Sequence, residues 1–211
     1  TFHVGGTASN ITAESSIIAR YDGVAEIEEL RTVNKVDEEI GKVDIVIGRL
    51  AELRIVDKNT GIALSTHTIP YGSKLYIKPG KSVKKGDLIC EWDPFNAVII
   101  SELAGKIAFE NLIEGITYRE ESDEQTGFKE MVITETRDKT KNPIVKIVDG
   151  KGTVLKVYNL PVGAHLVVDE GKKVSSGDIL VKIPRAVGKS GRSSTGFPNT
   201  RGFEQLAGNF E

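Results

Sequence analysis

Short runs in which apolar and polar residues alternate dominate the chain, and Gly, Asp and Asn separate them. Val, Ile and Thr are frequent in these runs, which favours β-strands. Residues 16–30 predict two strands around Asp22-Gly23, because this dipeptide tolerates the positive φ angles of a tight hairpin turn. Residues 53–67 and 145–158 predict two further hairpins with longer turns. Helical periodicity is scarce: residues 30–39 predict at most one helical turn. The pattern therefore indicates an all-β fold, a small barrel or a sandwich.

An internal duplication underlies this pattern. Residues 70–89 align with residues 161–180 at a constant offset of 91, and residues 19–30 align with 101–112 at an offset of 82. The identical pairs of the first alignment include Pro70/Pro161, Gly72/Gly163, Leu75/Leu166, Gly80/Gly171, Val83/Val174, Gly86/Gly177 and Asp87/Asp178. We infer two tandem homologous β units, residues 16–94 and 95–185, with flanks at 1–15 and 186–211. The change of offset predicts about nine extra residues in the second unit, and the polar stretch 120–142 is their expected place.

The repeated glycines suit turns better than a ligand site. Glycine accepts backbone angles that a Cβ atom penalises, and each Gly-Asp pair, at 86–87 and at 177–178, precedes a predicted strand. A phosphate-binding loop is not expected, because no GxGxxG or GxxxxGK[ST] motif precedes a helix.

Composition narrows the class of protein. The 28 Lys and Arg residues nearly balance the 30 Asp and Glu residues, so the chain is not expected to wrap nucleic acid over its whole surface. No apolar run approaches the ~20 residues of a membrane span, and no signal peptide opens the sequence. Cys90 is the only cysteine, which excludes internal disulfides and cysteine-cluster zinc sites. A cytoplasmic location is expected.

Few side chains suggest chemistry. His3, His67 and His165 are far apart and lack metal-ligand spacing, so no metal site is predicted. Cys90 is expected to be a buried, inert thiol, and Trp92 a packing anchor at a strand end. The acidic stretch 119–124 lacks the order of a calcium loop and is expected to be solvated. No catalytic constellation is predicted within the two units.

Two alternatives of other classes remain open. The order of turns and strands also resembles the hammerhead of biotinyl and lipoyl carrier domains, which present a lysine at an exposed hairpin tip. Here the expected tips carry residues 93–96 and 184–185, and Lys189 lies beyond the second tip. A free-standing β-barrel binding module, for nucleic acid for example, is the other alternative, although few aromatic residues are available to stack on bases.

Five short motifs occur in an order that points to one family. They are TFHVGG (1–6), ESSI (14–17), PYG (70–72), WDP (92–94) and SSGDILVKIPR (175–185). Over roughly residues 1–191, the chain resembles the trigger-loop region of the β′ subunit of bacterial DNA-directed RNA polymerase, including its large lineage-specific insertion. This resemblance implies two sandwich-barrel hybrid motifs inserted into a mobile hairpin that folds over the incoming nucleotide.

The resemblance also implies roles for individual residues. Thr1, Phe2 and His3 match the end of the first trigger helix, where His3 contacts the phosphates of the nucleotide and Thr1 belongs to the substrate site. The Mg²⁺-binding aspartates lie elsewhere in that subunit, so the segment needs no cofactor of its own and is expected to be inactive alone. The implied partners are the rest of β′, the β, α, ω and σ subunits, DNA and nascent RNA. Residues 192–211 depart from the family pattern and are expected to be flexible.

Overall fold

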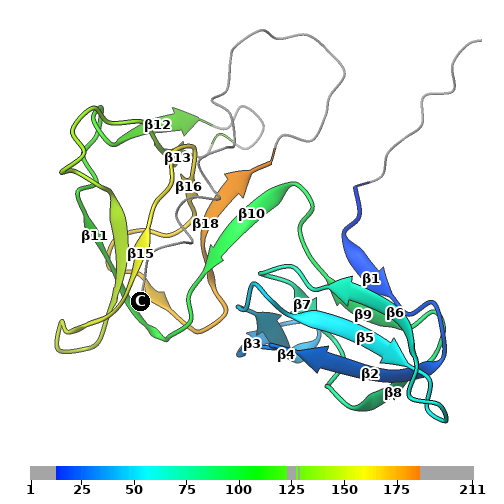
Figure 1. The fold of residues 1–211 in the computed structure, drawn as a ribbon. Helices are drawn as coiled ribbons and strands as arrows, with labels where there is room; N and C mark the ends of the chain where they lie inside the picture. The colour runs from blue at the N-terminus through cyan, green and yellow to red at the C-terminus, as the bar shows by residue number, and fades with distance from the viewer. Residues whose placement is uncertain (1–12, 123–126, 128, 186–211) are drawn as a thin grey trace, which may run out of the picture.

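Strands account for all the regular structure in the computed structural model, which describes residues 13–122, 127 and 129–185. Within these ranges it contains 18 β-strands and no helix (Figure 1). The first nine strands are β1 (Ser16–Ile18), β2 (Gly23–Glu28), β3 (Thr32–Asp37), β4 (Gly41–Val46), β5 (Glu52–Val56), β6 (Ala63–Thr68), β7 (Lys74–Leu75), β8 (Lys81–Val83) and β9 (Leu88–Glu91). The other nine are β10 (Asn96–Ile100), β11 (Gly105–Glu110), β12 (Tyr118–Ser122), β13 (Lys129–Ile133), β14 (Ile144–Val148), β15 (Val154–Asn159), β16 (His165–Leu166), β17 (Lys173–Val174) and β18 (Ile179–Pro184).

The two sets of nine strands have the same topology. In the first, one sheet has the order β1-β9-β7-β4-β3 and the other β6-β5-β2-β8; in the second, the orders are β10-β18-β16-β13-β12 and β15-β14-β11-β17. Each order maps onto its counterpart when nine is added to every strand number. The expected all-β fold of two tandem homologous units is thus confirmed, as paired antiparallel sheets of which none closes into a barrel within the described ranges. The flanks 1–12 and 186–211 lie outside the described residues.

Each unit has its own apolar core, filled by alternate residues of its two sheets. Leu53, Ile55 and Ile89 are fully buried in the first core, and Val145, Ile147 and Leu180 in the second. Because side chains alternate across a strand, these residues point between the sheets while their neighbours face outward.

Backbone geometry repeats as closely as strand order. Gly86 and Gly177 both have positive φ, at 98° and 86°, as the turn prediction requires. In each turn the following aspartate accepts a backbone hydrogen bond, Asp87 from Lys84 at 2.9 Å and Asp178 from Ser175 at 2.8 Å.

Two of the three predicted hairpins are confirmed. Strands β5 and β6 pair directly, as do β14 and β15, and Asp57 and Asp149 accept backbone N–H bonds in the respective turns. The hairpin around Asp22-Gly23 is wrong: β1 pairs with β9, and β2 with β5 and β8. Gly23 packs so closely on the next strand that a Cβ would lie 2.5 Å from the Val56 carbonyl oxygen, and the turn carries the chain from one sheet to the other.

Two further expectations need correction. Most of residues 30–39 forms strand β3 rather than a helical turn, because Val33 packs against the apolar cluster between the units. The extra residues of the second unit are only partly in 120–142: the link between β13 and β14 is 134–143 against 47–51 between β4 and β5, but the link 111–117 replaces the shorter 29–31. Thr117 is fully buried in that longer link and hydrogen-bonds Ile113 and Asn111, so the insertion is folded into the unit.

Candidate interaction site at the seam between the units

A third apolar cluster joins the two units; we call it the seam. Val43 and Ile45 on β4 and Ile100 on β10 are all at most 4% exposed there. The partly buried residues packed against them are Val33, Ile47, Tyr71, Tyr76, Val98 and Ile179. The seam therefore fixes the two units against each other by apolar burial rather than by the connecting chain alone.

Tyr71 lies at the centre of the seam. The Pro70-Tyr71-Gly72 turn presents its ring to the second unit, and its hydroxyl oxygen accepts a hydrogen bond from the Ile100 backbone N–H at 3.1 Å. Gly72 has φ +85°, and a Cβ on it would lie 2.6 Å from Val98 Cγ2. Burial raises the pKa of Tyr71, so the hydroxyl remains protonated at neutral pH. Close backbone approach and a positive φ together explain why this turn uses glycine.

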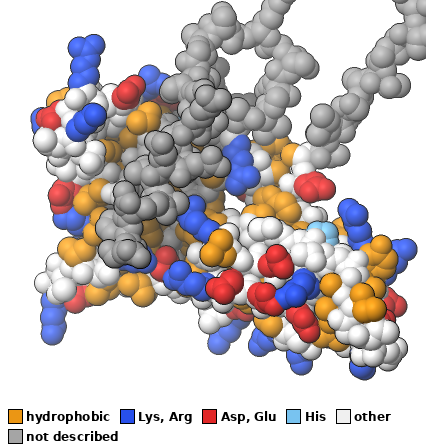
Figure 2. Space-filling model, viewed as in Figure 1, with side chains coloured by type: hydrophobic (Ala, Val, Ile, Leu, Met, Phe, Trp, Pro, Cys, Tyr) orange, Lys and Arg blue, Asp and Glu red, His pale blue; other side chains and the backbone are white. Residues whose placement is uncertain are grey.

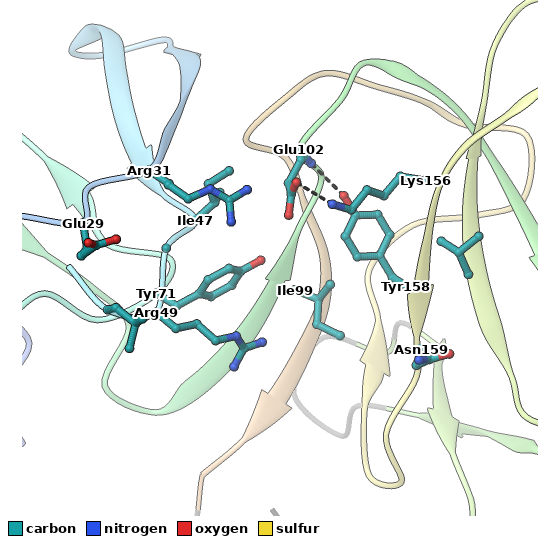
Figure 3. A pocket seen from close by; sticks show the side chains of 13 residues that line it. Glu29, Arg31, Ile47, Arg49, Tyr71, Ile99, Glu102, Lys156, Tyr158 and Asn159 are labelled. Atoms are coloured by element: carbon teal, nitrogen blue, oxygen red, sulfur yellow. Dashed lines mark hydrogen bonds and ion pairs between the residues drawn. The ribbon is translucent and has the colours of Figure 1, made fainter. Parts of the chain in front are cut away.

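A cleft of about 500 Å³, lined by both polar and apolar side chains, opens beside Tyr71, between the units. In Figure 3, Tyr71 and Arg49 project into it from the first unit and Glu102, Lys156 and Tyr158 from the second. The Lys156 ammonium donates to Glu102 Oε2 at 2.7 Å, and the Tyr158 hydroxyl accepts from the Glu102 backbone N–H at 2.9 Å. The hydrogen bond to Glu102 raises the pKa of Lys156.

Cations from the first unit border the same cleft. The Arg49 guanidinium lies 5.2 Å from the centre of the Tyr71 ring, within cation–π range. Arg31 also lines the cleft, and its charge acts against the protonated form of Lys156. Glu102 therefore pairs with Lys156 of its own unit and shares the cleft with Arg31 and Arg49 of the first unit. Among the described residues, the cleft contains no nucleophile beside a general base.

The turn at Gly177 makes the second polar contact across the seam. The Ser176 hydroxyl donates to the Asn34 carbonyl oxygen at 3.0 Å, and the Lys35 ammonium lies 3.7 Å from Asp178 Oδ1. A Cβ on Gly177 would lie 2.8 Å from Lys35 Cβ. In the second unit this repeated turn thus contacts the neighbouring unit, whereas its counterpart at Gly86 makes no such contact within the described part of the chain.

The structure describes only some of the residues that the sequence singled out. His3 and Thr1 lie outside the described residues, so their role stays a prediction. His67 lies on β6, and its Nε2 is buried without a hydrogen-bond partner among the described residues; His165 on β16 contacts Glu130 Oε2 through Nδ1 at 2.8 Å. No group of three or more His, Cys, Asp or Glu within the described ranges is arranged to hold a metal ion.

Cys90 and Trp92 behave as predicted. Cys90 is fully buried, and this burial raises the pKa of its thiol to about 11, which makes it a poor nucleophile at neutral pH. Trp92 packs against the first core directly after β9, and its backbone N–H donates to the Ser15 carbonyl.

The carrier alternative has no support. Asp93 and Phe95, at the expected hairpin tip, belong to the link that joins β9 to β10, where Asp93 accepts a backbone hydrogen bond from Phe95 at 2.8 Å. The Phe95 carbonyl also accepts from the Arg185 N–H, which ties the link to the end of β18. A connection of this kind has no free tip on which to present a cofactor, and Lys189 lies outside the described residues.

Charge on the visible surface is mixed. Figure 2 shows Lys, Arg, Asp and Glu side chains interspersed on that face, without a broad single-sign area among the residues it describes. Within the described residues no helix long and apolar enough for a bilayer occurs. A nucleic-acid-binding groove is therefore not supported by this face.

Sequence reasoning missed the seam residues Tyr71, Glu102, Lys156 and Tyr158. A usable signal existed: where the two repeats differ, the second unit carries Glu102 in place of Arg20 and Tyr158 in place of His67, and the first carries Tyr71 in place of Val162. Differences between otherwise similar units mark the surfaces where one unit touches the other.

Fold and seam together define a duplicated all-β module whose two units pack on each other. No protein-family model matches the chain. It is 61% identical over 199 residues to the DNA-directed RNA polymerase subunit β′ of Parabacteroides distasonis, 56% over 198 residues to that of Bacteroides fragilis, and 52% over 198 residues to that of Flavobacterium johnsoniae.

Each of these matches covers 94% of the chain and 14% of the relative. The chain is thus similar to a segment that makes up 14% of these β′ subunits, and the resemblance to the β′ subunit found in the sequence is confirmed.

Proposed function

We propose that the chain is a non-catalytic module of the β′ subunit of a bacterial DNA-directed RNA polymerase, and that it modulates trigger-loop folding. The observation that carries the proposal is the identity to β′ subunits over 94% of the chain, combined with a two-unit body locked by an apolar seam. The polymerase itself joins nucleotides on a DNA template in the cytoplasm. It does so with the remainder of β′ and with the β, α, ω and σ subunits, DNA and nascent RNA as partners.

The proposed mechanism is mechanical. A body inserted in a loop that must order and disorder biases this equilibrium whenever its contacts with the enzyme differ between the two loop states. A difference of about 1.4 kcal/mol changes the ratio of folded to unfolded loop about tenfold. Rigidity matters, because a contact made by one unit moves the loop only if the seam transmits it.

Chemistry at the nucleotide belongs to the flank and to the rest of the enzyme. We propose that His3, with Thr1 beside it, contacts the phosphates of the incoming nucleotide and neutralises charge as phosphoryl transfer proceeds. Mg²⁺ would be held by aspartates elsewhere in β′. His3→Gln in the whole polymerase should slow nucleotide addition while leaving pause-site choice unchanged.

Deletion tests the mechanical role. Replacing residues 12–185 by a short Gly/Ser linker in the whole polymerase should change pause lifetimes and transcript-cleavage rates while nucleotide addition persists. Gly163→Ala, which changes the second unit away from the seam, is the control and should leave pausing as in the unaltered enzyme. Unchanged pause lifetimes after the deletion would contradict the proposal.

A further inference from the structure

The surface by which the second unit packs on the first has a counterpart on the first unit. Ile100 and Ile179, paired across β10 and β18, belong to the seam. Their counterparts by the repeat offsets of 82 and 91 are Ile18 and Leu88, paired in the same way across β1 and β9. Ile100 is 2% exposed, whereas Ile18 is 50% exposed and Leu88 39%. Ile100 is covered and Ile179 partly buried in the second unit, whereas both of their counterparts in the first unit are exposed.

The surroundings of this pair show the same contrast. Gly177 packs against Lys35, whereas its counterpart Gly86 is exposed, and no atom of the described residues lies within 4 Å of the point that a Cβ on it would occupy. In the second unit the Tyr158 hydroxyl is hydrogen-bonded at the seam; its counterpart His67 has a buried Nε2 without a partner among the described residues. His67 lines a cleft of about 280 Å³ together with Ile18 and Arg20. The first unit therefore retains the shape of a docking face.

The side-chain charges around this apolar pair differ between the two units, and the difference indicates the chemistry of the partner. Where the second unit has Glu102, Ser175 and Ser176, the first has Arg20, Lys84 and Lys85. Glu102 shares its cleft with Arg31 and Arg49 of the other unit, so the change to Arg20 replaces a negative charge at that position by a positive one. Among the described residues, none of these three cations forms a salt bridge; the carboxylates of Asp22 and Asp87, which keep their charge, accept the backbone N–H groups of Lys85 and Lys84.

We propose that the face formed by Ile18, Leu88, Arg20, Lys84 and Lys85 docks an acidic protein surface of the polymerase that presents an apolar side chain flanked by carboxylates. That the partner belongs to the polymerase rests on the proposed function; its chemistry rests on the face alone. The two adjacent apolar side chains favour protein over nucleic acid, since phosphates leave them exposed to water.

A second copy of the chain is a weaker occupant. To bind this face, a second copy would have to use the part of its second unit that corresponds to the Tyr71 side of the seam. There Val162 replaces Tyr71 and Glu130 replaces the buried Val43. The apolar surface at that end is therefore smaller than the one on the first unit and carries a negative charge at Glu130, although the counterpart of Ile45, Val132, stays apolar.

Photocrosslinking tests the proposal in the purified whole polymerase. A benzoylphenylalanine in place of Ile18 should form an adduct with an acidic segment of a polymerase protein, mapped by mass spectrometry. The control places the same group at Val36, which is 75% exposed on β3, at the opposite edge of the same sheet. Retained nucleotide addition verifies that both variants are assembled.

Charge reversal adds a second readout. Arg20→Glu with Lys85→Glu should reduce the Ile18 adduct about tenfold, whereas Lys42→Glu on the exposed part of β4 should leave it unchanged. Adducts with DNA or RNA, adducts between two copies of β′, no adduct, or equal yields from Val36 would each overturn the proposal. The crosslink reports docking whether or not pausing changes, so it fails independently of the deletion experiment.

Discussion

The Ile100 backbone N–H donates to the Tyr71 hydroxyl oxygen across 3.1 Å, and this bond links a strand of the second unit to a turn of the first. Ile100 lies at the outer edge of β10, whose other edge pairs with β18. A buried edge N–H needs an acceptor, because an unsatisfied one costs free energy comparable to a lost hydrogen bond. Tyr71 supplies that acceptor and apolar area at the same point.

Removing this hydroxyl should weaken the seam. Tyr71→Phe keeps the ring but leaves the Ile100 N–H without its acceptor, so the free energy of unfolding should fall by about 1–2 kcal/mol in urea denaturation. Tyr21→Phe, at a residue that is 48% exposed, is the control and should have little effect. Equal losses in both variants would show that Tyr71 does not hold the seam.

Alanine substitutions at Gly72 and Gly163 distinguish the cost of backbone strain from the cost of crowding at the seam. They are counterparts with φ of +85° and +83°, so alanine at either position carries the same penalty of about 1–2 kcal/mol for a left-handed conformation. Of the two, only Gly72 would bring its added Cβ against another described atom, Val98 Cγ2 at 2.6 Å. Gly72→Ala should therefore be more destabilising than Gly163→Ala by about 1–3 kcal/mol, measured by denaturant unfolding. Equal losses of stability in the two variants would mean that the seam accommodates the added methyl group at no cost in free energy.

Cys90 should be unreactive until the first unit unfolds. Its buried thiol has a pKa of about 11, so iodoacetamide labelling at pH 8 should be slow in the native chain and fast in denaturant. The folded thiol binds its proton more tightly than an exposed cysteine, whose ordinary pKa is 9.0. Above that value the unfolded state loses the proton first, so stability falls as pH rises toward 11. Cys90→Ala should lack this part of the alkaline slope, and fast native labelling would contradict the assignment.

Two equivalent aspartates should contribute to acid sensitivity. The backbone N–H of Thr60 lowers the pKa of Asp57, and that of Thr153 lowers the pKa of Asp149. Their stabilising effect is present above the unfolded pKa of about 4 and is lost as pH falls through the lower folded value. Asp57→Ala or Asp149→Ala should thus be destabilising at pH 7, and the difference from the unaltered chain should shrink in acid. A difference independent of pH would indicate that the charge is not involved.

The sequence alone determined the strand-rich fold, the duplication and the turns. Residues 145–158 form a hairpin because alternation and an Asp-Gly turn act over a few neighbouring residues. Gly86 and Gly177 adopt positive φ for the same local reason. The buried state of Cys90 also followed from its apolar neighbours.

Tertiary structure decided which surfaces meet. The strands beside Asp22-Gly23 separate into different sheets because close packing of Gly23 on Val56 outweighs the local preference for a hairpin. Ile18 and Ile100 occupy equivalent positions in the two repeats, yet only Ile100 is covered. Burial depends on contacts between residues far apart in the chain, such as Tyr71 and Ile100, which hydrophobic alternation does not predict and only the differences between the two repeats indicate. A single sequence therefore defines the repeated unit, whereas the packing of one unit on the other defines the seam.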